Sequence, residues 1–264
     1  MIDVKALDVY FNRGLPIENH VLRGLSLSIE QGQFVTVIGS NGAGKSTLLN
    51  ALSGDVNISG GEISIGDQRV DHLQCHQRAS MVARVFQDPM AGTCEKLSIA
   101  ENLALAMRRG KKRGLGWALR RQYQQQFVAA LSELGLGLEK RLDDQMGLLS
   151  GGQRQAVSLL MATLQPMQIL LLDEHTAALD PKTAKFVLEL SEQYIRKRKL
   201  TALMVTHSMQ QALDHGDRTI MLHEGQVVFD IHGPERDKMQ IVDLLNLFAQ
   251  TKGEQLSDDS LLLG

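Results

Sequence analysis

Residues 34–53 read FVTVIGSNGAGKSTLLNALS, and this stretch decides the fold class. The apolar run Phe34–Ile38 predicts a short strand buried on both faces, and the residues from Lys45 to Leu52 predict a helix. The loop between them, GSNGAGKST, satisfies the phosphate-loop pattern G-x-x-x-x-G-K-[ST]. Because strand, glycine-rich loop and helix follow one another in the required order, we expect an α/β protein that binds a nucleotide.

The loop also indicates how a phosphate chain is held. Its glycines let the backbone wrap closely, so that successive N–H groups point at phosphate oxygens, and the helix that follows presents its amino terminus to the same anion. Lys45 is expected to reach the outer phosphates, and the Ser46 hydroxyl to ligate Mg²⁺. The predicted nucleotide-binding residues of the loop are Gly39, Ser40, Asn41, Gly42, Ala43, Gly44, Lys45, Ser46 and Thr47.

The composition is that of an ordinary globular protein and argues against several classes. Among the 264 residues, 28 basic and 30 acidic side chains leave a formal charge of -2, which gives no overall electrostatic case for nucleic-acid binding. No apolar run reaches the roughly 18 residues of a membrane span, and the opening residues do not read as a signal peptide. Two cysteines provide no disulfide framework. The sequence therefore predicts a cytosolic chain.

Strand and helix patterns continue along the rest of the chain. Val4, Ala6 and Val9 alternate loosely and predict a first strand. Between residues 91 and 149, apolar side chains recur at helical spacing, which predicts a mostly helical insert. Further strands are predicted at 25–29, 62–65, 68–70, 81–86, 169–172 and 203–205, a hairpin at 217–222 and 226–230, and helices at 181–199 and 241–249.

Five further motifs follow the phosphate loop in a fixed order. They are VFQDP (85–89), LSGGQ (149–153), ILLLDE (169–174), AALD (177–180) and LMVTHS (203–208). With these motifs the chain resembles the ATPase subunits of ABC transporters over essentially its whole length. Nucleotide kinases and GTPases share the phosphate loop but not LSGGQ, so the chain resembles them less than it resembles ABC ATPases.

The resemblance implies an architecture. The expected fold is an α/β P-loop NTPase core of the ABC ATPase type, with a small antiparallel β-subdomain and a helical subdomain. Residues 1–264 form a single ABC ATPase domain on this view. Its expected parts are a core at about 1–90 and 156–233, a helical subdomain with the signature motif at 91–155, and a terminal helix and tail at 234–264.

The carboxylates of ILLLDE point to hydrolytic chemistry. An apolar strand that ends in two acids places Asp173 at the carboxyl edge of a buried sheet, where it is expected to hold the metal through water. Glu174 is the expected general base for the attacking water. By the resemblance, Gln87 senses the metal and the γ-phosphate as a further metal ligand, and His207 contacts the γ-phosphate.

LSGGQ is expected to open a helix with Ser150 at its cap, which makes a second anion site. In the family two subunits pack head to tail, and the signature of one closes on the γ-phosphate held by the other. A single chain is then catalytically incomplete, and Asp180 lies at the dimer interface. Asp180 before Pro181 also predicts a helix start. The signature residues are Leu149, Ser150, Gly151, Gly152 and Gln153.

Three other features carry expectations. An aromatic residue near the start stacks on adenine in this family, and Phe11 is the predicted one, with Tyr10 second; ordinary core packing of Phe11 is the alternative. His175 stands where most relatives have proline, either as tolerated variation or with a role of its own. The basic run Arg108–Arg121 is a solvated segment, a contact for anionic lipid headgroups or a permease loop, or, as the least favoured alternative, a contact for nucleic acid.

The resemblance implies the ATP-binding and ATP-hydrolysing, energy-coupling subunit of a membrane transporter. The sequences VFQDPMAGT (85–93) and DEHTAALDPKTA (173–184) most resemble those of ATPases from importers of small solutes such as amino acids, aromatic amino acids included. ATP and Mg²⁺ are the implied cofactors. The implied partners are a second copy of the chain, an integral membrane permease and, indirectly, an extracytoplasmic solute-binding protein, at the cytoplasmic face of the inner membrane. Nucleic acid is not an expected partner.

Two alternatives stay open on the sequence. An ABC exporter ATPase for lipid or lipoprotein is set aside only by the resemblance just described. A soluble ABC ATPase acting on DNA or on ribosomes fits less well. DNA-repair relatives carry a long coiled-coil insertion, whereas the insert at 91–149 is short and lacks sustained heptads. Ribosome-associated relatives carry two cassettes in one chain, and this chain has one.

Overall fold

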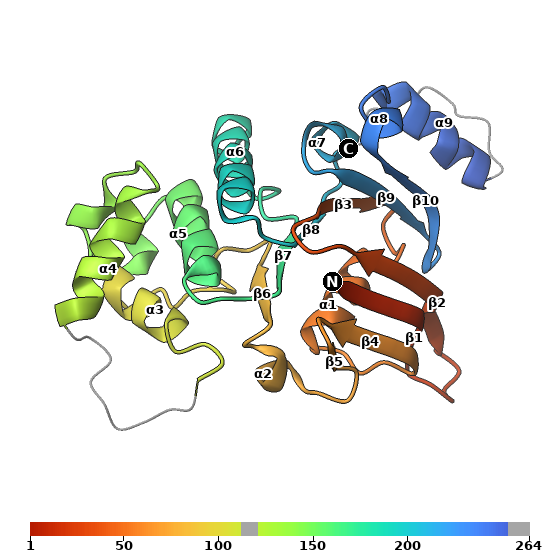
Figure 1. Cartoon of the computed structure of the whole chain (residues 1–264), viewed down its shortest axis with the longest axis horizontal. Helices are drawn as coiled ribbons and strands as arrows, with labels where there is room; N and C mark the ends of the chain where they lie inside the picture. The colour runs from red at the N-terminus through yellow and green to blue at the C-terminus, as the bar shows by residue number, and fades with distance from the viewer. Residues whose placement is uncertain (112–120, 253–264) are drawn as a thin grey trace. The chain divides into compact units, whose positions relative to one another are not determined.

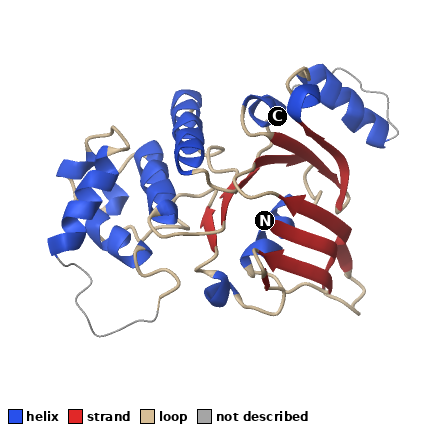
Figure 2. Ribbon diagram, viewed as in Figure 1, coloured by secondary structure: helices blue, strands red, loops and turns tan. Residues whose placement is uncertain are grey.

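The computed structural model describes residues 1–111 and 121–252 of the chain. These form two compact units: unit 1 contains Met1–Cys75 and the chain from Lys199 onward, and unit 2 contains His76–Arg198. Strands dominate unit 1 and helices dominate unit 2 (Figure 2). The two units are described separately below.

The first sheet of unit 1 is antiparallel, and β2, β1 and β4 lie side by side in it (Figure 1). Its strand order is β2-β1-β4-β5, with β1 (Ile2–Phe11), β2 (Asn19–Ile29), β4 (Gly60–Ile65) and β5 (Gln68–Arg69). The alternation predicted for β1 is wrong at Ala6, which is exposed with a φ of 45°. The pairing with β2 shifts between Val4 and Leu7, so Leu7 takes the buried place instead.

The second set of strands in unit 1 carries the phosphate loop. β3 (Phe34–Gly39) pairs in parallel with β8 (Ala202–Val205) and with β9 (Arg218–His223), and β9 pairs antiparallel with β10 (Gln226–His232). The first five residues of β3 are all buried, as predicted for a strand covered on both faces. The helices of this unit are α1 (Lys45–Ser53), α7 (Met209–Asp214), α8 (Gly233–Arg236) and α9 (Ile241–Lys252).

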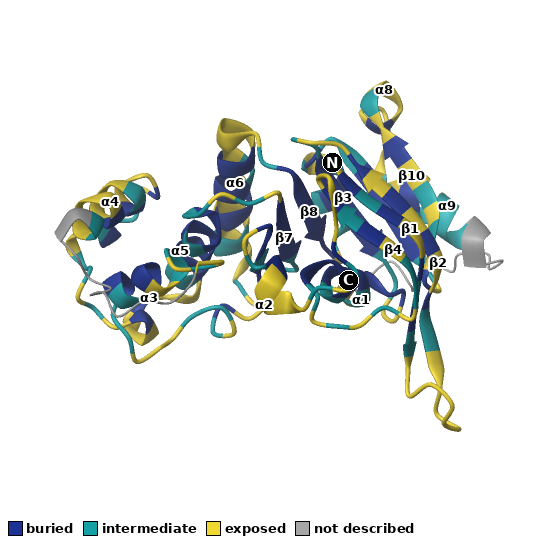
Figure 3. Ribbon diagram, turned by 60° about the horizontal axis from the view of Figure 1, so that its bottom comes forward, coloured by how far each residue is buried: buried dark blue, intermediate teal, exposed yellow. Residues whose placement is uncertain are grey.

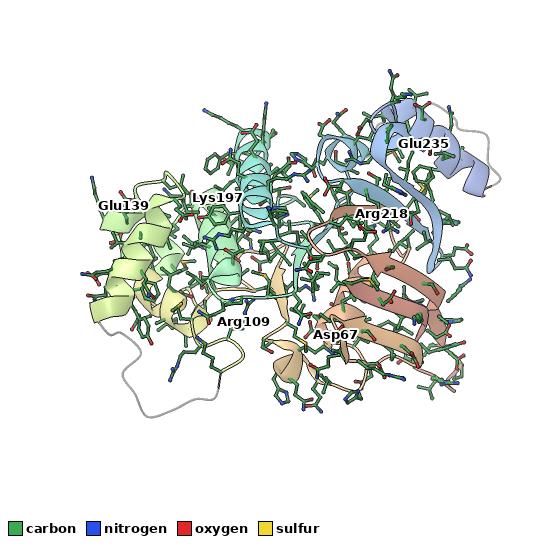
Figure 4. The ribbon with its side chains drawn as sticks, viewed as in Figure 1. Asp67, Arg109, Glu139, Lys197, Arg218 and Glu235 are labelled. Atoms are coloured by element: carbon green, nitrogen blue, oxygen red, sulfur yellow. The ribbon has the colours of Figure 1, made fainter. Side chains whose placement is uncertain are left out.

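A buried apolar cluster and a bidentate ion pair stabilise the strands and helices around β3 and β9. Ile38 of β3 and Met221 of β9 form a buried cluster with Ala212 of α7 and Leu244 of α9. At the start of β9, Arg218 pairs with Asp230 of β10 through Nε (2.6 Å) and Nη2 (2.5 Å). Figure 4 labels Arg218 on its strand. Its planar guanidinium matches the carboxylate geometry, so the pair fixes the register of the hairpin predicted at 217–230.

Unit 2 is built around two parallel strands, β6 (Val82–Val85) and β7 (Ile169–Asp173). The first four residues of β7 are buried (Figure 3). Its helical elements, with a short helix at its start, are α2 (Cys75–Arg78), α3 (Ile99–Ala106), α4 (Arg121–Ser132), η1 (Leu138–Lys140), η2 (Met146–Leu148), α5 (Gly151–Thr163) and α6 (Pro181–Arg198).

The insert at 91–149 is less continuously helical than its spacing predicts. Ile99, Leu103, Phe127 and Leu131 are fully buried, as the helical pattern requires. Between α4 and α5, however, only two 3₁₀ turns form, because two glycines with positive φ, Gly135 and Gly137, turn the backbone there. Among residues 1–111 and 121–252, no helix has the length and apolar character needed to cross a bilayer.

Candidate functional site

The phosphate loop connects β3 to α1 in unit 1, as predicted. Gly44 precedes the helix with a φ of 99°, a conformation that favours glycine. A Cβ at this position would lie 2.7 Å from Cδ2 of Leu22, so a larger residue would require the Leu22 side chain to shift. The loop therefore holds the tight path onto the helix amino terminus that phosphate binding needs.

Lys45 is folded onto the loop itself. Its Nζ donates hydrogen bonds to the carbonyl oxygens of Gly39 (2.7 Å) and Ser40 (3.1 Å), and the residue is only 5% exposed. Ser46, the next residue, is exposed, so its hydroxyl is accessible from solvent. The ammonium thus lies at the loop in the conformation from which it would exchange carbonyl oxygens for phosphate oxygens.

His207 lies at the same sheet edge as the phosphate loop. β3 and β8 are parallel neighbours with Val37 opposite Val205, and the N–H of Thr206 donates to the carbonyl of Val37 at 3.1 Å. His207 follows directly and is exposed. Since the carboxyl ends of parallel neighbours meet at one edge, the histidine and the loop face the same region of unit 1.

Phe11 ends β1 in unit 1, and the alternative that it packs in the core is wrong. Its side chain is 39% exposed. Tyr10 instead stacks on His20, with ring centroids 3.8 Å apart, and the Arg13 guanidinium lies over the Tyr10 ring at 5.1 Å. Of the two aromatic candidates, Phe11 has the more accessible ring in the described structure.

The two carboxylates lie where β7 ends in unit 2. Asp173 is the last residue of the strand, and Glu174 follows in a turn with a φ of 44°. The left-handed conformation is unfavourable for a residue with a side chain, by about 1–3 kcal/mol. Gln87 follows the neighbouring parallel strand, in which Val85 pairs with Leu172. Asp173 and Gln87 therefore lie at the same end of this strand pair.

His175 anchors the turn after Glu174. It is 1% exposed, and its Nε2 lies 2.9 Å from the hydroxyl of Ser191 on α6. The Ser191 hydroxyl donates to the carbonyl of Val187 at 2.8 Å, so the imidazole Nε2–H is the donor to Ser191. The unusual histidine is a buried, hydrogen-bonded connection between the Glu174 turn and α6.

The signature motif forms a capped helix start, as predicted. The Ser150 hydroxyl accepts from the Gln153 N–H at 3.3 Å, and the Gln153 side chain accepts from the Ser150 N–H at 3.2 Å. Arg154 holds the loop before it through hydrogen bonds to the carbonyls of Gly147 (3.0 Å) and Leu149 (3.3 Å). Gln155, fully buried, donates to the carbonyl of Phe86 at 3.0 Å. It thereby ties α5 to the segment that leads into Gln87.

Asp180 caps α6, as its position before Pro181 predicts. Its Oδ1 accepts from the Thr183 N–H at 3.1 Å. Hydrogen bonds from the side chain and backbone of Thr183 lower the pKa of the Asp180 carboxyl, so it stays ionised at the helix start. The side chain is exposed, which leaves it accessible to a partner surface.

At Gly152, α5 packs tightly against Thr183 of α6. A Cβ there would lie 2.1 Å from Cγ2 of Thr183. Gly152→Ala is therefore expected to lower the free energy of unfolding by about 1–3 kcal/mol, as overpacking does, measured by urea denaturation. The matched control is Gly152→Ala combined with Thr183→Ser, which deletes the clashing methyl, keeps the hydroxyl and should recover most of the loss. Equal stability of Gly152→Ala and the wild type would contradict this packing.

The predicted site residues divide between the two units. The phosphate loop, Phe11 and His207 belong to unit 1, whereas Gln87, the signature, Asp173, Glu174 and Asp180 belong to unit 2. Sequence reasoning assigned no role to Arg84, Arg154, Gln155 or Thr183. For Arg84 and Gln155 the reason is that their partners, Asp173 and Phe86, lie far along the chain. In the basic run, residues 112–120 and the side chain of Arg121 lie outside what the structure describes.

In the described part of the run, Arg109 is half-buried. Arg109 donates through Nη2 to the carbonyl of Gln165 at 3.0 Å, and burial lowers the pKa of its guanidinium. Arg108 and Lys111 precede and follow it in the chain. Arg109 therefore has a structural contact within unit 2, whatever the rest of the basic run binds.

Comparison with known proteins gives the family. Residues 22–177 match the ABC transporter family. The chain is 44% identical to a tyrosine transport ATP-binding protein of Clostridioides difficile, over 94% of this chain and 98% of the relative. It is 38% identical to an aliphatic sulfonates import ATP-binding protein of Rhizobium johnstonii, over 82% of this chain and 73% of the relative. It is 34% identical to a thiamine import ATP-binding protein of Escherichia coli, over 80% of this chain and 86% of the relative.

Solved structures agree. An ATP-binding cassette in a dimeric post-hydrolysis state with ADP and Pi has a TM-score of 0.75 and 27% identity, covering 88% of this chain and 98% of that one. The ADP conformation of another cassette, 22% identical with a TM-score of 0.77, shares the fold. The predicted α/β fold of the ABC ATPase type is thus confirmed. The chain belongs to the ABC transporter family, as one of its ATP-binding and ATP-hydrolysing cassettes.

Proposed function

We propose that this cassette is the energy-coupling subunit of an importer for a small solute, an aromatic amino acid of the tyrosine kind. The relative named as a tyrosine transport ATP-binding protein carries this proposal, because the chain covers 98% of its length at 44% identity. Relatives named for sulfonate and thiamine import support the direction of transport.

The proposed assembly contains a second copy of the chain, packed head to tail, and an integral membrane permease. A dimeric cassette at 27% identity supports the pairing. An extracytoplasmic solute-binding protein delivers the cargo to the permease, and the cassette lies at the cytoplasmic face of the inner membrane. Within the chain, we assign 1–90 and 156–233 to the nucleotide-binding core and 91–155 to the helical part that meets the permease.

The proposed catalytic roles follow from the side chains. Lys45 binds the outer phosphates of ATP, and His207 donates a hydrogen bond to the γ-phosphate. Glu174 accepts a proton from the attacking water as the new bond to γ-phosphorus forms and the bond to the bridging oxygen of ADP breaks. Ser150 and the backbone N–H groups that follow it, from the partner copy, stabilise the γ-phosphate. Phe11 stacks on adenine.

Mg²⁺ fits the donors that the chain offers. The Ser46 hydroxyl, the Gln87 amide oxygen and the Asp173 carboxylate are all hard oxygen ligands, the kind this ion prefers. Ser46 and Gln87 are both exposed, so their oxygens can be reached. A magnesium ion held by such donors would neutralise charge on the β- and γ-phosphates.

Lys45→Ala is expected to weaken ATP binding about tenfold to a hundredfold, because a charge-assisted hydrogen bond to phosphate is lost. Isothermal titration calorimetry measures the affinity, and thermal unfolding shows whether the loop has loosened without its two lysine contacts. The matched control is Lys185→Ala, the same change at a lysine whose side chain is 80% exposed on α6. Unchanged affinity in Lys45→Ala would remove Lys45 from the phosphate site.

The proposed function is tested by capture from native membranes. Tagged Glu174→Gln with ATP is purified from detergent-solubilised membranes, and the co-purifying chains are identified by mass spectrometry. A multi-span protein at one copy per cassette supports the importer, and binding assays on its companion solute-binding protein identify the cargo. Recovery of only ribosomal proteins or DNA-repair factors would overturn the transport role. Co-purification of a permease that transports lipid or lipoprotein outward would replace import with export.

A further inference from the structure

A guanidinium lies beside the metal-binding carboxylate assigned above. In unit 2, Arg84 of β6 pairs with Leu171 of β7. Side chains alternate along a strand, so Asp173, two residues beyond Leu171, faces the same side as Arg84 and is its diagonal neighbour. The Arg84 Nη2 donates to the Asp173 Oδ2 at 2.5 Å.

Both partners are largely withdrawn from water. The side chains of Arg84 and Asp173 are 12% and 13% exposed, so their attraction is screened less than that of a surface pair. The guanidinium also lies over the Phe86 ring, 4.8 Å from its centroid. The guanidinium thus contacts both the Asp173 carboxylate and the Phe86 ring.

Packing of β6 does not require a charged residue at position 84. Its neighbours Val82, Ala83 and Val85 are buried apolar residues. Burying a guanidinium in this strand carries a desolvation penalty, which the contact with Asp173 offsets. Arg84 and Asp173 are therefore energetically coupled, and a change at one is felt at the other.

We propose that Arg84 is a built-in counter-ion of Asp173 that competes with Mg²⁺ for this carboxylate and so sets the Mg²⁺ concentration at which the nucleotide is held. The proposal rests on the assignment of Asp173 to the metal under the proposed function. A cation that uses Asp173, directly or through water, meets a carboxylate whose charge the protein has already balanced. Arg84 is on this view a positioning residue, which acts on the site through Asp173.

The test is nucleotide binding without turnover. The full chain is titrated with an ATP analogue that has a non-hydrolysable imido bridge, at a series of Mg²⁺ concentrations. Arg84→Met is expected to lower the half-saturating Mg²⁺ concentration by about threefold to tenfold, because the competing charge is gone. Arg84→Lys keeps the charge and should stay close to the wild type. Arg84→Gln carries the same expectation as Arg84→Met, and thermal unfolding shows which variants are folded.

A second variant, Asp173→Asn, distinguishes failure of the Arg84 proposal from failure of the assignment of Asp173 to Mg²⁺. With Asp173→Asn alone, the half-saturating Mg²⁺ concentration should rise, and adding Arg84→Met should then change it no further. If Asp173→Asn leaves the Mg²⁺ dependence unchanged, Asp173 is not the metal carboxylate. If Asp173→Asn raises it but the neutral Arg84 variants leave it unchanged or raise it too, Arg84 does not compete with the ion, and the proposal alone is overturned.

Discussion

Glu174→Gln is expected to bind ATP about as tightly as the wild type and to lose at least about a hundredfold of its hydrolysis rate. Glutamine has the same shape as glutamate and fills the same turn after β7, but its amide cannot accept the proton of the attacking water. The left-handed backbone at this residue, with φ 44°, is retained because the two side chains differ only at their ends. Steady-state phosphate release and calorimetry with ATP measure the two quantities.

The same variant is expected to accumulate as an ATP-dependent dimer, because a closed dimer that cannot hydrolyse its nucleotide has no route to reopen. Size-exclusion chromatography with light scattering, with and without ATP, follows this directly. Glu189→Gln is the matched control, since it makes the same change at an exposed residue of α6 and should behave as the wild type. Hydrolysis by Glu174→Gln at the wild-type rate would remove Glu174 from the role of general base.

Ser150→Arg is expected to spare ATP binding by the isolated chain and to reduce turnover to the level of Glu174→Gln. The large side chain would obstruct the γ-phosphate held by the partner copy, while the phosphate loop of its own chain is untouched. Arginine also cannot accept the hydrogen bond from the Gln153 N–H, so the α5 cap is lost at a cost of about 1 kcal/mol. Ser150→Ala loses the cap without adding bulk and should keep more activity than Ser150→Arg.

Mixing variants tests the head-to-tail arrangement itself. Ser150→Arg has an intact phosphate loop, and Lys45→Ala has an intact signature, so a mixed dimer contains one site with both parts intact. Equimolar mixtures should therefore hydrolyse more ATP than either variant alone, measured at equal total protein. Normal hydrolysis by Ser150→Arg on its own would show that the signature does not complete a site in trans.

The features predicted from sequence are those whose signals are local in the chain. The phosphate loop is recognisable because strand, glycines, lysine and helix are contiguous. The caps at Ser150 and Asp180 are recognisable because the accepting side chain and the helix N–H that donates to it lie three residues apart. Buried β3 was predicted from five consecutive apolar or small positions. In each case the partner that satisfies the residue is its own neighbour.

What the sequence did not predict depends on partners far along the chain. Arg84 and Asp173 are 89 residues apart, and only the β6–β7 register makes them neighbours. The roles of His175 and Gly152 depend on Ser191 and Thr183 of a helix whose packing no motif encodes. At Ala6 the period of two breaks because the backbone itself turns, so a pattern read from side chains assigns the wrong residue to the buried face.

The contacts of Lys45 bear on which nucleotides the cassette retains. Because the ammonium already donates to the carbonyls of Gly39 and Ser40, an incoming anion does not meet a hydrated cation but displaces two internal acceptors. The free energy of binding is then a difference between two sets of contacts, and it favours the ligand only when the phosphates offer more than the loop gives up. A nucleoside monophosphate offers few oxygens in that exchange. A nucleoside triphosphate is therefore expected to bind this loop more tightly than a nucleoside monophosphate, even before any partner subunit closes on the site.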